Sequence, residues 1–320
     1  MIEFLPVLVL VLTFVVLLII GVPVAWCIAI SSMFTLMLAM PVSAATTTVS
    51  QRIATGLDSF ALLAIPFFIL SGQIMSKGGI ANRLISFAKT LVGFLPGGLA
   101  LINIVSAMLM GAIAGSAMAS ASAMGTILGP EMEKEGYSKE FGAAVNITSS
   151  TTGLVIPPSN TLIVYSLASG GVSIAALFLA GYIPGILTGL LMMIVAMIWA
   201  KKNNYPVGKR SSLKEVFVKF IDAFPSLLLL VIVIGGIIGG IFTATEASAV
   251  AVLYTVLLSF YYKEMSLKDL PKVILESVET TSIVMLLIGA SMCMSWVLSY
   301  ENIPQDISNA LLSVSDNKIV

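Results

Sequence analysis

The segment from residue 146 to residue 160, NITSSTTGLVIPPSN, holds the side chains best suited to binding an ion or a small anion. Hydroxyl and amide groups cluster there beside a glycine and two adjacent prolines, inside an otherwise apolar stretch. Hydroxyl and carbonyl oxygens are hard ligands of the kind that a cation such as Na⁺ takes, and amides at a helix N-terminus favour a carboxylate. We therefore take this segment as the first candidate binding site.

A break in a helix would supply both kinds of backbone group. Helix entering from residue 138 is predicted to end near Thr152, because Gly153 and the two prolines cannot sustain it, and to resume at Asn160. The candidate cation ligands are Asn146, Ser149, Ser150, Thr151, Thr152, Gly153 and Val155. The candidates for an anionic substrate group are Pro157, Pro158, Ser159 and Asn160. The other interpretation is a proline kink whose Ser and Thr residues only satisfy freed backbone groups.

A second polar segment lies at 97–129, with a centre rich in Gly, Ala and Ser. Its two arms of about 14 residues would each reach only about 20 Å, too short to cross a bilayer. This predicts a re-entrant hairpin with its tip near residues 116–122, and the alternative is one long helix that packs through its small residues. Ser116 is a further candidate for the cation, and Ser120 and Ser122 for the substrate, although each Ser could equally be a packing residue.

The amino-acid composition indicates the environment of the elements that position these residues. Of 320 residues, 58% are hydrophobic and 10% are charged, whereas soluble domains are nearer a quarter charged. Long apolar runs predict an all-α polytopic protein in a lipid bilayer. There is no His, which excludes His-based metal sites and proton relays, and the net charge of +0 gives no nucleic-acid footprint. Cys27 and Cys293 lie in apolar segments and are predicted to be buried thiols.

The apolar runs predict the following order along the chain. Two crossings are followed by an interfacial piece and a crossing within 57–90, then by the hairpin and by a broken helix at 138–169. Further crossings follow, and two interfacial helices are expected at 46–56 and 263–275. The predicted crossings outside 57–169 are 4–20, 24–40, 173–200, 223–242, 245–262 and 279–299.

The Lys and Arg residues predict the orientation, because basic loops stay in the cytoplasm. The densest basic cluster follows residue 200, and every other basic cluster falls on the same side if 97–129 enters and leaves on one face. The N-terminus is then expected on the outer side of the membrane.

The second half of the chain resembles the first half. Residues 5–26 pair with 224–248, and 56–72 pair with 277–293, so that Pro6 meets Pro225 and Asp58 meets Glu279. Because the two units start on opposite sides, this is an inverted repeat, an architecture of secondary transporters. The second repeat reads as truncated at the C-terminus: about 100 residues, holding a second hairpin and a second broken helix, are expected beyond Val320.

The repeat predicts three parts with different roles. Residues 1–90 would form the scaffold and interfacial arm of repeat one, and 91–200 its moving transport part. Residues 201–320 would form the scaffold and arm of repeat two, which is incomplete.

Three sequence blocks resemble a known family. GAIAGSAMASASAMGTILGPEMEKEGYSKEFGAAVNITSSTTGLVIPPSN at 111–160 looks like the signature region of the large membrane subunit of tripartite ATP-independent periplasmic (TRAP) transporters. GLDSFALLAIPFFILSGQIMSKGGI at 56–80 and GGIFTATEASAV at 239–250 are similar to two further blocks. The resemblance covers nearly the whole chain.

The resemblance implies an elevator-type transporter that couples organic-acid uptake to Na⁺. It also implies two protein partners, a small four-helix membrane subunit and a periplasmic substrate-binding protein. Many members carry an acidic residue in the hairpin tip where this chain has Ser120. A carboxylate at the tip therefore cannot serve here.

The function expected from all of this is Na⁺-coupled import of an organic acid, such as a dicarboxylate, sialic acid or a sugar acid. The runner-up is a stand-alone organic-anion symporter or cation antiporter of the ion transporter superfamily, to which the resemblance also points. An enzyme is not expected. An intramembrane hydrolase would need a Ser–Lys or Asp pair within the spans, and this chain has no His and no Lys at membrane depth. Glu246 is expected to cap a helix with Thr243 or Thr245 rather than to take part in coupling.

Overall fold

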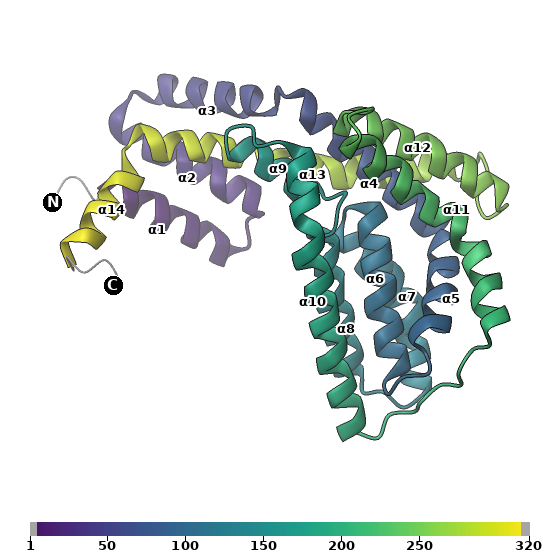
Figure 1. Ribbon diagram of the computed structural model, residues 1–320. Helices are drawn as coiled ribbons and strands as arrows, with labels where there is room; N and C mark the ends of the chain where they lie inside the picture. The colour runs from purple at the N-terminus through teal and green to yellow at the C-terminus, as the bar shows by residue number, and fades with distance from the viewer. Residues whose placement is uncertain (1–4, 315–320) are drawn as a thin grey trace. The chain divides into compact units, whose positions relative to one another are not determined.

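A computed structural model describes residues 5–314, with side chains for 5–309. All of its regular elements are helices (Figure 1), and the described residues contain five helices that are long and apolar enough to cross a membrane. This confirms the all-α polytopic class. Packing divides the chain into two compact units, residues 1–59 with 280–320, and residues 60–279.

The first unit contains three helices of 16 residues each, α1 (Leu5–Ile20), α2 (Val24–Ala39) and α3 (Val42–Leu57). It is completed by the last part of α13 (Leu270–Tyr300) and by α14 (Ile303–Val314). Its core includes Leu36 and Cys293, both fully buried, and the Arg52 guanidinium lies 4.2 Å from the centre of the Trp296 ring. Cys27 and Cys293 are free, buried thiols, as predicted.

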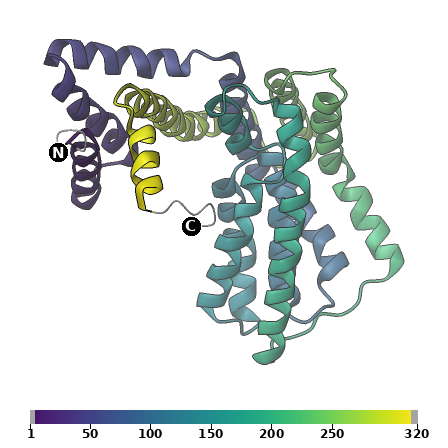
Figure 2. The ribbon, with the colours of Figure 1, turned by 60° about the vertical axis from the view of Figure 1, so that its left-hand side comes forward.

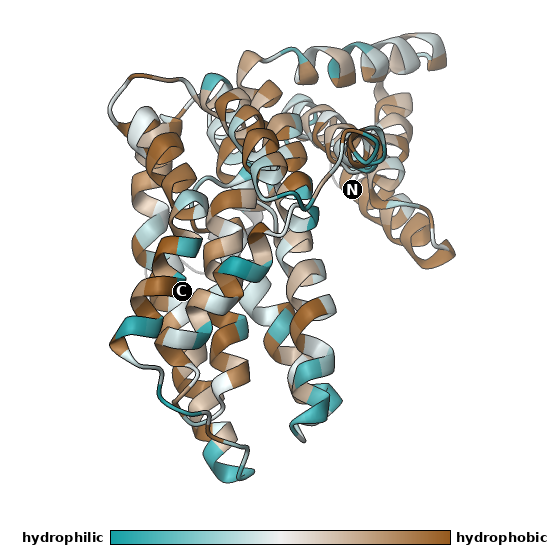
Figure 3. Ribbon diagram, turned by 90° about the vertical axis from the view of Figure 1, so that its right-hand side faces the viewer, coloured by the Kyte–Doolittle hydropathy of each residue, from teal (hydrophilic) through white to brown (hydrophobic). Residues whose placement is uncertain are grey.

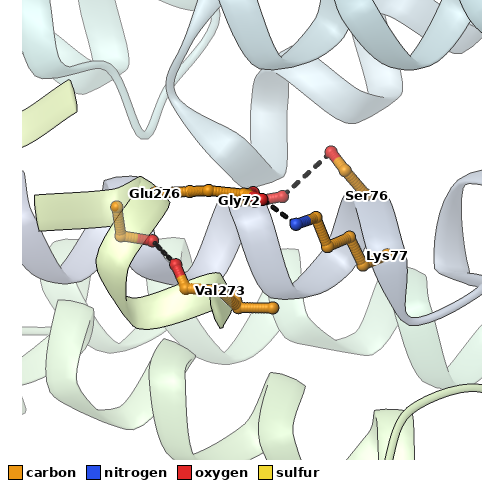
Figure 4. Close-up of polar contacts among 6 residues, drawn as sticks. Gly72, Ser76, Lys77, Val273 and Glu276 are labelled. Atoms are coloured by element: carbon orange, nitrogen blue, oxygen red, sulfur yellow. Dashed lines mark hydrogen bonds and ion pairs between the residues drawn. The ribbon is translucent and has the colours of Figure 1, made fainter. Parts of the chain in front are cut away.

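The second unit includes η1 (Phe60–Leu63), α4 (Ala64–Lys77), α5 (Ile80–Val92), α11 (Leu213–Ile238) and α12 (Ala244–Tyr261). Helix α4 packs along α12, and α5 packs along α11. Ion pairs join these elements. Lys77 pairs with Glu276 of α13, as Figure 4 shows, and Arg83 lies within 4 Å of both Asp222 and Glu264.

The same unit holds a bundle of long helices, α6 (Gly98–Ala114), α7 (Ala117–Lys134), α8 (Lys139–Ser150) and α10 (Ile174–Lys202). Helices α6, α7 and α8 pack against one another and run side by side in two views (Figures 1 and 2). Helix α6 is the most buried of them, with Asn103 and Ser106 inside the unit. The helix ends and loops of the unit carry most of its hydrophilic residues, whereas the middles of the helices are apolar (Figure 3).

Serine and threonine define where several of these helices begin. The side chains of Ser138, Ser173, Ser212 and Thr243 each accept a hydrogen bond from the amide three residues later. Each of them thus satisfies one of the amides that a helix leaves unpaired at its N-terminus.

Three predicted segments differ in the structure. The predicted interfacial helix at 263–275 is wrong as a separate element, because α13 begins at Leu270 and runs unbroken through the predicted crossing at 279–299, which is confirmed as part of a helix of crossing length. Within 57–90 the predicted order is also wrong. The apolar stretch of crossing length comes first, at Phe60–Lys77, and the 13-residue α5 after it reaches only about 20 Å. Helix α11 begins ten residues earlier than the predicted 223.

The predicted crossings at 173–200 and 245–262 agree with α10 and α12, which are long and apolar enough to cross a membrane. The segments 4–20 and 24–40 coincide with the apolar helices α1 and α2, which are shorter than that, so their crossing of the membrane stays a prediction. The expected helix at 46–56 lies inside α3. The division of the chain by role, at 1–90, 91–200 and 201–320, stays a prediction, because the compact units reflect packing and not motion.

Candidate functional site

The predicted break in the helix at 138–169 is present. Helix α8 ends at Ser150, a short 3₁₀ turn, η2 (Thr151–Leu154), carries the chain further, and α9 (Asn160–Ala168) begins after the two prolines. The Ser159 hydroxyl oxygen accepts a hydrogen bond from the Leu162 amide at 3.4 Å and so caps α9. The break takes its backbone groups out of the regular helical pattern. The Thr152 carbonyl accepts from the Val155 and Ile156 amides, and the Leu154 carbonyl accepts from the Ser159 hydroxyl.

The predicted hairpin is also present, but its tip is narrower than the predicted 116–122. The turn consists of Gly115, with φ +60°, and Ser116, whose side chain accepts a hydrogen bond from the Ala119 amide. Because Ser116 caps α7, helix resumes at once, and Ser120 and Ser122 lie inside α7 instead of at the tip. The arms are correspondingly longer than predicted, at 17 and 18 residues.

The hairpin tip and the broken helix meet through backbone atoms. The Asn160 amide donates a hydrogen bond to the Gly115 carbonyl at 3.4 Å. A Cβ at Gly115 would lie 2.7 Å from the Pro158 carbonyl oxygen, and a Cβ at Gly153 would lie 2.9 Å from the Gly111 Cα. Glycine is therefore required on both sides of this backbone contact.

The contact between the hairpin tip and the broken helix brings together the ends of α6, α7 and α9 and the turn η2. The N-termini of α7 and α9 adjoin at Ser116 and Asn160, and the C-terminal end of α6 lies against η2 at Gly111 and Gly153. Helix N-termini carry partial positive charge, and C-termini carry partial negative charge. The arrangement can therefore attract an anionic group at one side and a cation at the other.

The hydroxyl groups of the break have oxygens that can still act as ligands. Thr152 donates its hydrogen to the Ser149 carbonyl at 2.6 Å, and Ser150 donates to the Asn146 carbonyl at 2.7 Å. A hydroxyl that donates its hydrogen retains two lone pairs on oxygen, which can coordinate a cation. Ser149, Ser150 and Thr152 are buried, and Thr151 is exposed.

Two amide side chains hold the broken helix against the hairpin. Ser149 donates to Asn103 Oδ1 of α6 at 2.9 Å, and Asn146 Nδ2 donates to the Ala121 carbonyl of α7 at 2.9 Å. Asn103 and Asn146 thus bridge helices. The sequence had not singled out Ser106, which is buried one turn after Asn103 on the same face of α6.

Several buried oxygens around the hairpin and the broken helix lack a hydrogen-bond partner among residues 5–309. They are Ser106 Oγ, Ser120 Oγ, Asn146 Oδ1 and Asn160 Oδ1. A buried polar atom without a partner costs free energy unless a ligand or water satisfies it. These atoms therefore mark positions where a bound species would gain hydrogen bonds or coordination.

The predicted site residues differ in burial, and Ser122 stands apart from the others. Gly153, Pro157, Pro158 and Ser159 are buried, and Val155 is half-buried. Pro158 lies beside Gly115, Gly153 lies beside Ser116, and Pro157 lies beside Gly181 of α10. Ser122 is exposed on α7. Their roles in binding stay predictions.

A cavity of about 230 Å³ adjoins Asn103 and Asn146. Its walls include Gly125, Gly129 and Gly142, and the Glu133–Lys139 ion pair, at 3.5 Å, lies at its edge. The glycines leave space between α7 and α8 that larger side chains would fill.

Glu246 has the predicted capping role. Thr243 and Glu246 form a capping box at the start of α12, in which each side chain accepts the other's backbone amide. The Thr245 hydroxyl instead donates to the Phe60 carbonyl at 2.9 Å. The carboxylate is thus engaged in starting a helix.

Comparison with known proteins gives consistent matches. A sequence model described as "Tripartite ATP-independent periplasmic transporter, DctM component" matches residues 11–320. The chain is 53% identical to YgiK of Salmonella typhimurium, over 98% of this chain and 72% of that protein. It is 42% identical to the C4-dicarboxylate TRAP transporter large permease protein DctM of Pseudomonas aeruginosa, over 79% of this chain and 59% of the relative. It is 37% identical to the sialic acid TRAP transporter large permease protein SiaM of Vibrio cholerae, over 85% and 64%. The chain therefore spans between 59% and 72% of the length of these relatives.

Proposed function

We propose, because the chain belongs to the DctM component family of tripartite ATP-independent periplasmic transporters, that it forms part of a Na⁺-coupled importer of an organic acid. Two of the named relatives are large permeases, one for C4-dicarboxylates and one for sialic acid. The shared chemistry of these solutes is a carboxylate. A small molecule bearing a carboxylate is therefore the proposed substrate.

The observation that carries this proposal is the junction of the hairpin tip with the broken helix. The Asn160–Gly115 hydrogen bond places the N-termini of α7 and α9 together, where their amides favour a carboxylate. The carbonyl-rich turn at Thr151–Leu154 lies beside it and favours a cation. Sites of this kind, on discontinuous helices, are typical of secondary transporters.

The two ligands are assigned to opposite sides of this junction. Na⁺ would be coordinated by oxygens of Ser149, Ser150, Thr152 and the adjoining carbonyls. The substrate carboxylate would lie toward Ser116, Ser159 and Asn160. Because both sit on one packed body, binding of one would favour binding of the other through electrostatic attraction.

The proposed partners are a small four-helix membrane subunit and a periplasmic binding protein that delivers the substrate. The proposed location is the bacterial inner membrane, with the N-terminus in the periplasm. Movement of the hairpin and broken helix against the remaining helices, as an elevator, would alternate access to the site.

Uptake into proteoliposomes tests the proposed function. The permease is reconstituted with its small subunit, and uptake of labelled C4-dicarboxylate and sialic acid is measured with and without a Na⁺ gradient and the binding protein. We expect uptake only when both are supplied. Uptake that needs the gradient but no binding protein would favour the stand-alone symporter, and uptake that needs neither would refute both.

Two substitutions test the site itself. Thr152→Val removes a buried hydroxyl with little change in volume, and we expect the Na⁺ concentration for half-maximal uptake to rise several-fold, since one ligand worth about 1–2 kcal/mol is lost. Asn160→Ala should raise the substrate concentration for half-maximal uptake by a similar factor. The matched control is Thr148→Val, because Thr148 makes the same kind of bond, 2.7 Å to the Ala144 carbonyl, on the exposed side of α8. An equal effect in Thr152→Val and its control would refute the cation site.

A further inference from the structure

A cavity of about 510 Å³ lies in the second unit, apart from the hairpin junction. It is enclosed by the end of α5, the start of α6, the loop that follows α10 and the first turns of α11. Its polar walls are Ser86, Lys89, Thr90, Glu135, Lys209, Arg210, Ser211, Glu215 and Lys219.

Positive charge predominates in this cavity, with four cations facing two carboxylates. Lys89 already pairs with Glu131, 2.9 Å away. Lys209, Arg210 and Lys219 have no ion pair within the described part of the chain, and the Arg210 guanidinium lies 5.6 Å from the centre of the Phe94 ring. Three cations that line one cavity and form no ion pair among the described residues indicate a site for an anion.

The backbone of the cavity is built before any ligand arrives. An antiparallel bridge between Pro96 and Val207 holds the loop after α10 against the turn before α6. A Cβ at Gly98 would lie 3.0 Å from the Gly93 carbonyl carbon, and one at Gly208 would lie 3.2 Å from it. These glycines let three backbone segments close the floor, where α6 begins and its first amides point out of the helix.

The surroundings of the cavity are those of a membrane boundary. The segment 201–219, from the end of α10 to the first turns of α11, is the most basic segment of the chain, and α11 continues as an apolar helix of crossing length. On α11, Leu213 is 90% exposed and Phe217 is 62% exposed, beside the lining residues Glu215 and Lys219. Phosphate groups of lipids lie where charged residues give way to exposed apolar ones.

We propose that this cavity binds the phosphate headgroup of an anionic phospholipid such as phosphatidylglycerol or cardiolipin. The cations contact the phosphodiester, the Ser211 hydroxyl donates a hydrogen bond to it, and the acyl chains lie against the exposed apolar face of α11. Free inorganic phosphate also carries negative charge, but it has no acyl chains to contact that apolar face. The site is independent of the substrate assigned above, and it can fail while the transport proposal stands.

Lipid binding to the purified, delipidated permease tests this proposal. Native mass spectrometry counts bound lipid during titration with phosphatidylglycerol, with phosphatidylcholine, or with inorganic phosphate as a competitor. The test variant is Lys209→Gln with Arg210→Gln, and the control is Lys201→Gln with Lys202→Gln, which removes the same charge from the neighbouring end of α10 outside the cavity. We expect the test variant to bind phosphatidylglycerol about 30-fold more weakly and the control to be unchanged within about twofold.

Three results would overturn the proposal. Equal weakening in both variants would indicate diffuse attraction to a basic surface, and equal binding of phosphatidylcholine would remove the requirement for an anionic lipid. Displacement of the lipid by millimolar inorganic phosphate would make free phosphate the ligand. Lys209→Arg with Arg210→Lys keeps the charge and should retain binding, which separates a local folding defect from loss of the site.

Discussion

At the scale of single residues, Gly111 and Gly153 are the most constrained positions of the candidate site. Their α carbons face each other where α6 passes η2, and a side chain on either would enter the other's backbone. A packed interior cannot absorb even one methyl group there without movement of two segments.

Gly153→Ala is therefore expected to destabilise the protein by about 1–3 kcal/mol through overpacking. The control is Gly129→Ala on α7, where an added Cβ meets nothing within 4 Å and alanine should be neutral or stabilising by up to about 1 kcal/mol. Thermal unfolding in detergent measures both. Equal melting temperatures for the two variants would contradict the close approach.

Tyr137 gives a pH-dependent prediction. It lies between α7 and α8, is only 4% exposed, and stacks on Tyr205 with ring centres 4.3 Å apart. Burial raises the pKa of Tyr137 from its ordinary value near 10 to about 12. Because the folded state resists loss of this proton, its contribution to stability is complete below pH 10 and disappears as the pH rises toward about 12.

Tyr137→Phe removes this group, so the loss of stability between pH 10 and pH 12 should be smaller in the variant than in the parent protein. Melting temperatures at several alkaline pH values measure the difference. Tyr165→Phe, at an exposed position on α9, serves as the control and should follow the parent. Parallel curves for parent and Tyr137→Phe would count against the effect.

At the scale of elements, Arg83 joins three segments of the second unit. From α5 its guanidinium lies 3.6 Å from the centre of the Tyr262 ring and within ion-pair distance of Asp222 on α11 and Glu264 after α12. The Arg83 side chain is 19% exposed, which protects these contacts from solvent more than those of a surface pair.

Arg83→Gln should accordingly lower the free energy of unfolding by about 1–2 kcal/mol, because several contacts of one partly buried cation are lost together. Lys139→Gln breaks the Glu133 pair, whose side chains are 51% and 76% exposed, and should cost less than about 0.5 kcal/mol. Denaturation monitored by fluorescence compares them. A loss in Lys139→Gln that matches Arg83→Gln would show that exposure does not govern these pairs.

Element boundaries were predictable where the sequence carries a strong local signal. Two prolines and a glycine located the break between α8 and α9, and Thr243 with Glu246 located the start of α12. The fusion of 263–275 with the following crossing was not predictable, since Pro271 stands in the first turn of α13, where proline is tolerated, and so does not end it. The tip of the hairpin was placed too broadly because small residues permit a loop but do not require one.

At the scale of the whole molecule, the helical class and the family followed from composition and from three sequence blocks. The contacts of the candidate site did not. The donation from Asn160 to Gly115 joins residues 45 positions apart, and no local pattern specifies which glycine faces which turn. Nor could the sequence separate Ser120, buried and without a partner, from the exposed Ser122.

The orientation of the chain in the membrane is testable by labelling, because both native cysteines are fully buried and should react little. Thr46→Cys places a thiol at an exposed position in the segment predicted to face the periplasm, and Asn203→Cys places one in the basic loop predicted to face the cytoplasm. A membrane-impermeant maleimide applied to intact cells should label the first and spare the second. Permeabilised cells, in which both should react, provide the control, and the reverse pattern in intact cells would invert the topology.

The junction between the hairpin and the broken helix has a consequence for how such a protein can evolve. It is made of main-chain atoms, the Asn160 amide, the Gly115 carbonyl and the bare α carbons of Gly111 and Gly153. Main-chain atoms are the same whichever side chains stand beside them, so exchanges at Ser116 or Ser120 leave this frame intact. In the proposed transporter, substrate preference can therefore change by point substitution, while this main-chain frame is inherited unchanged.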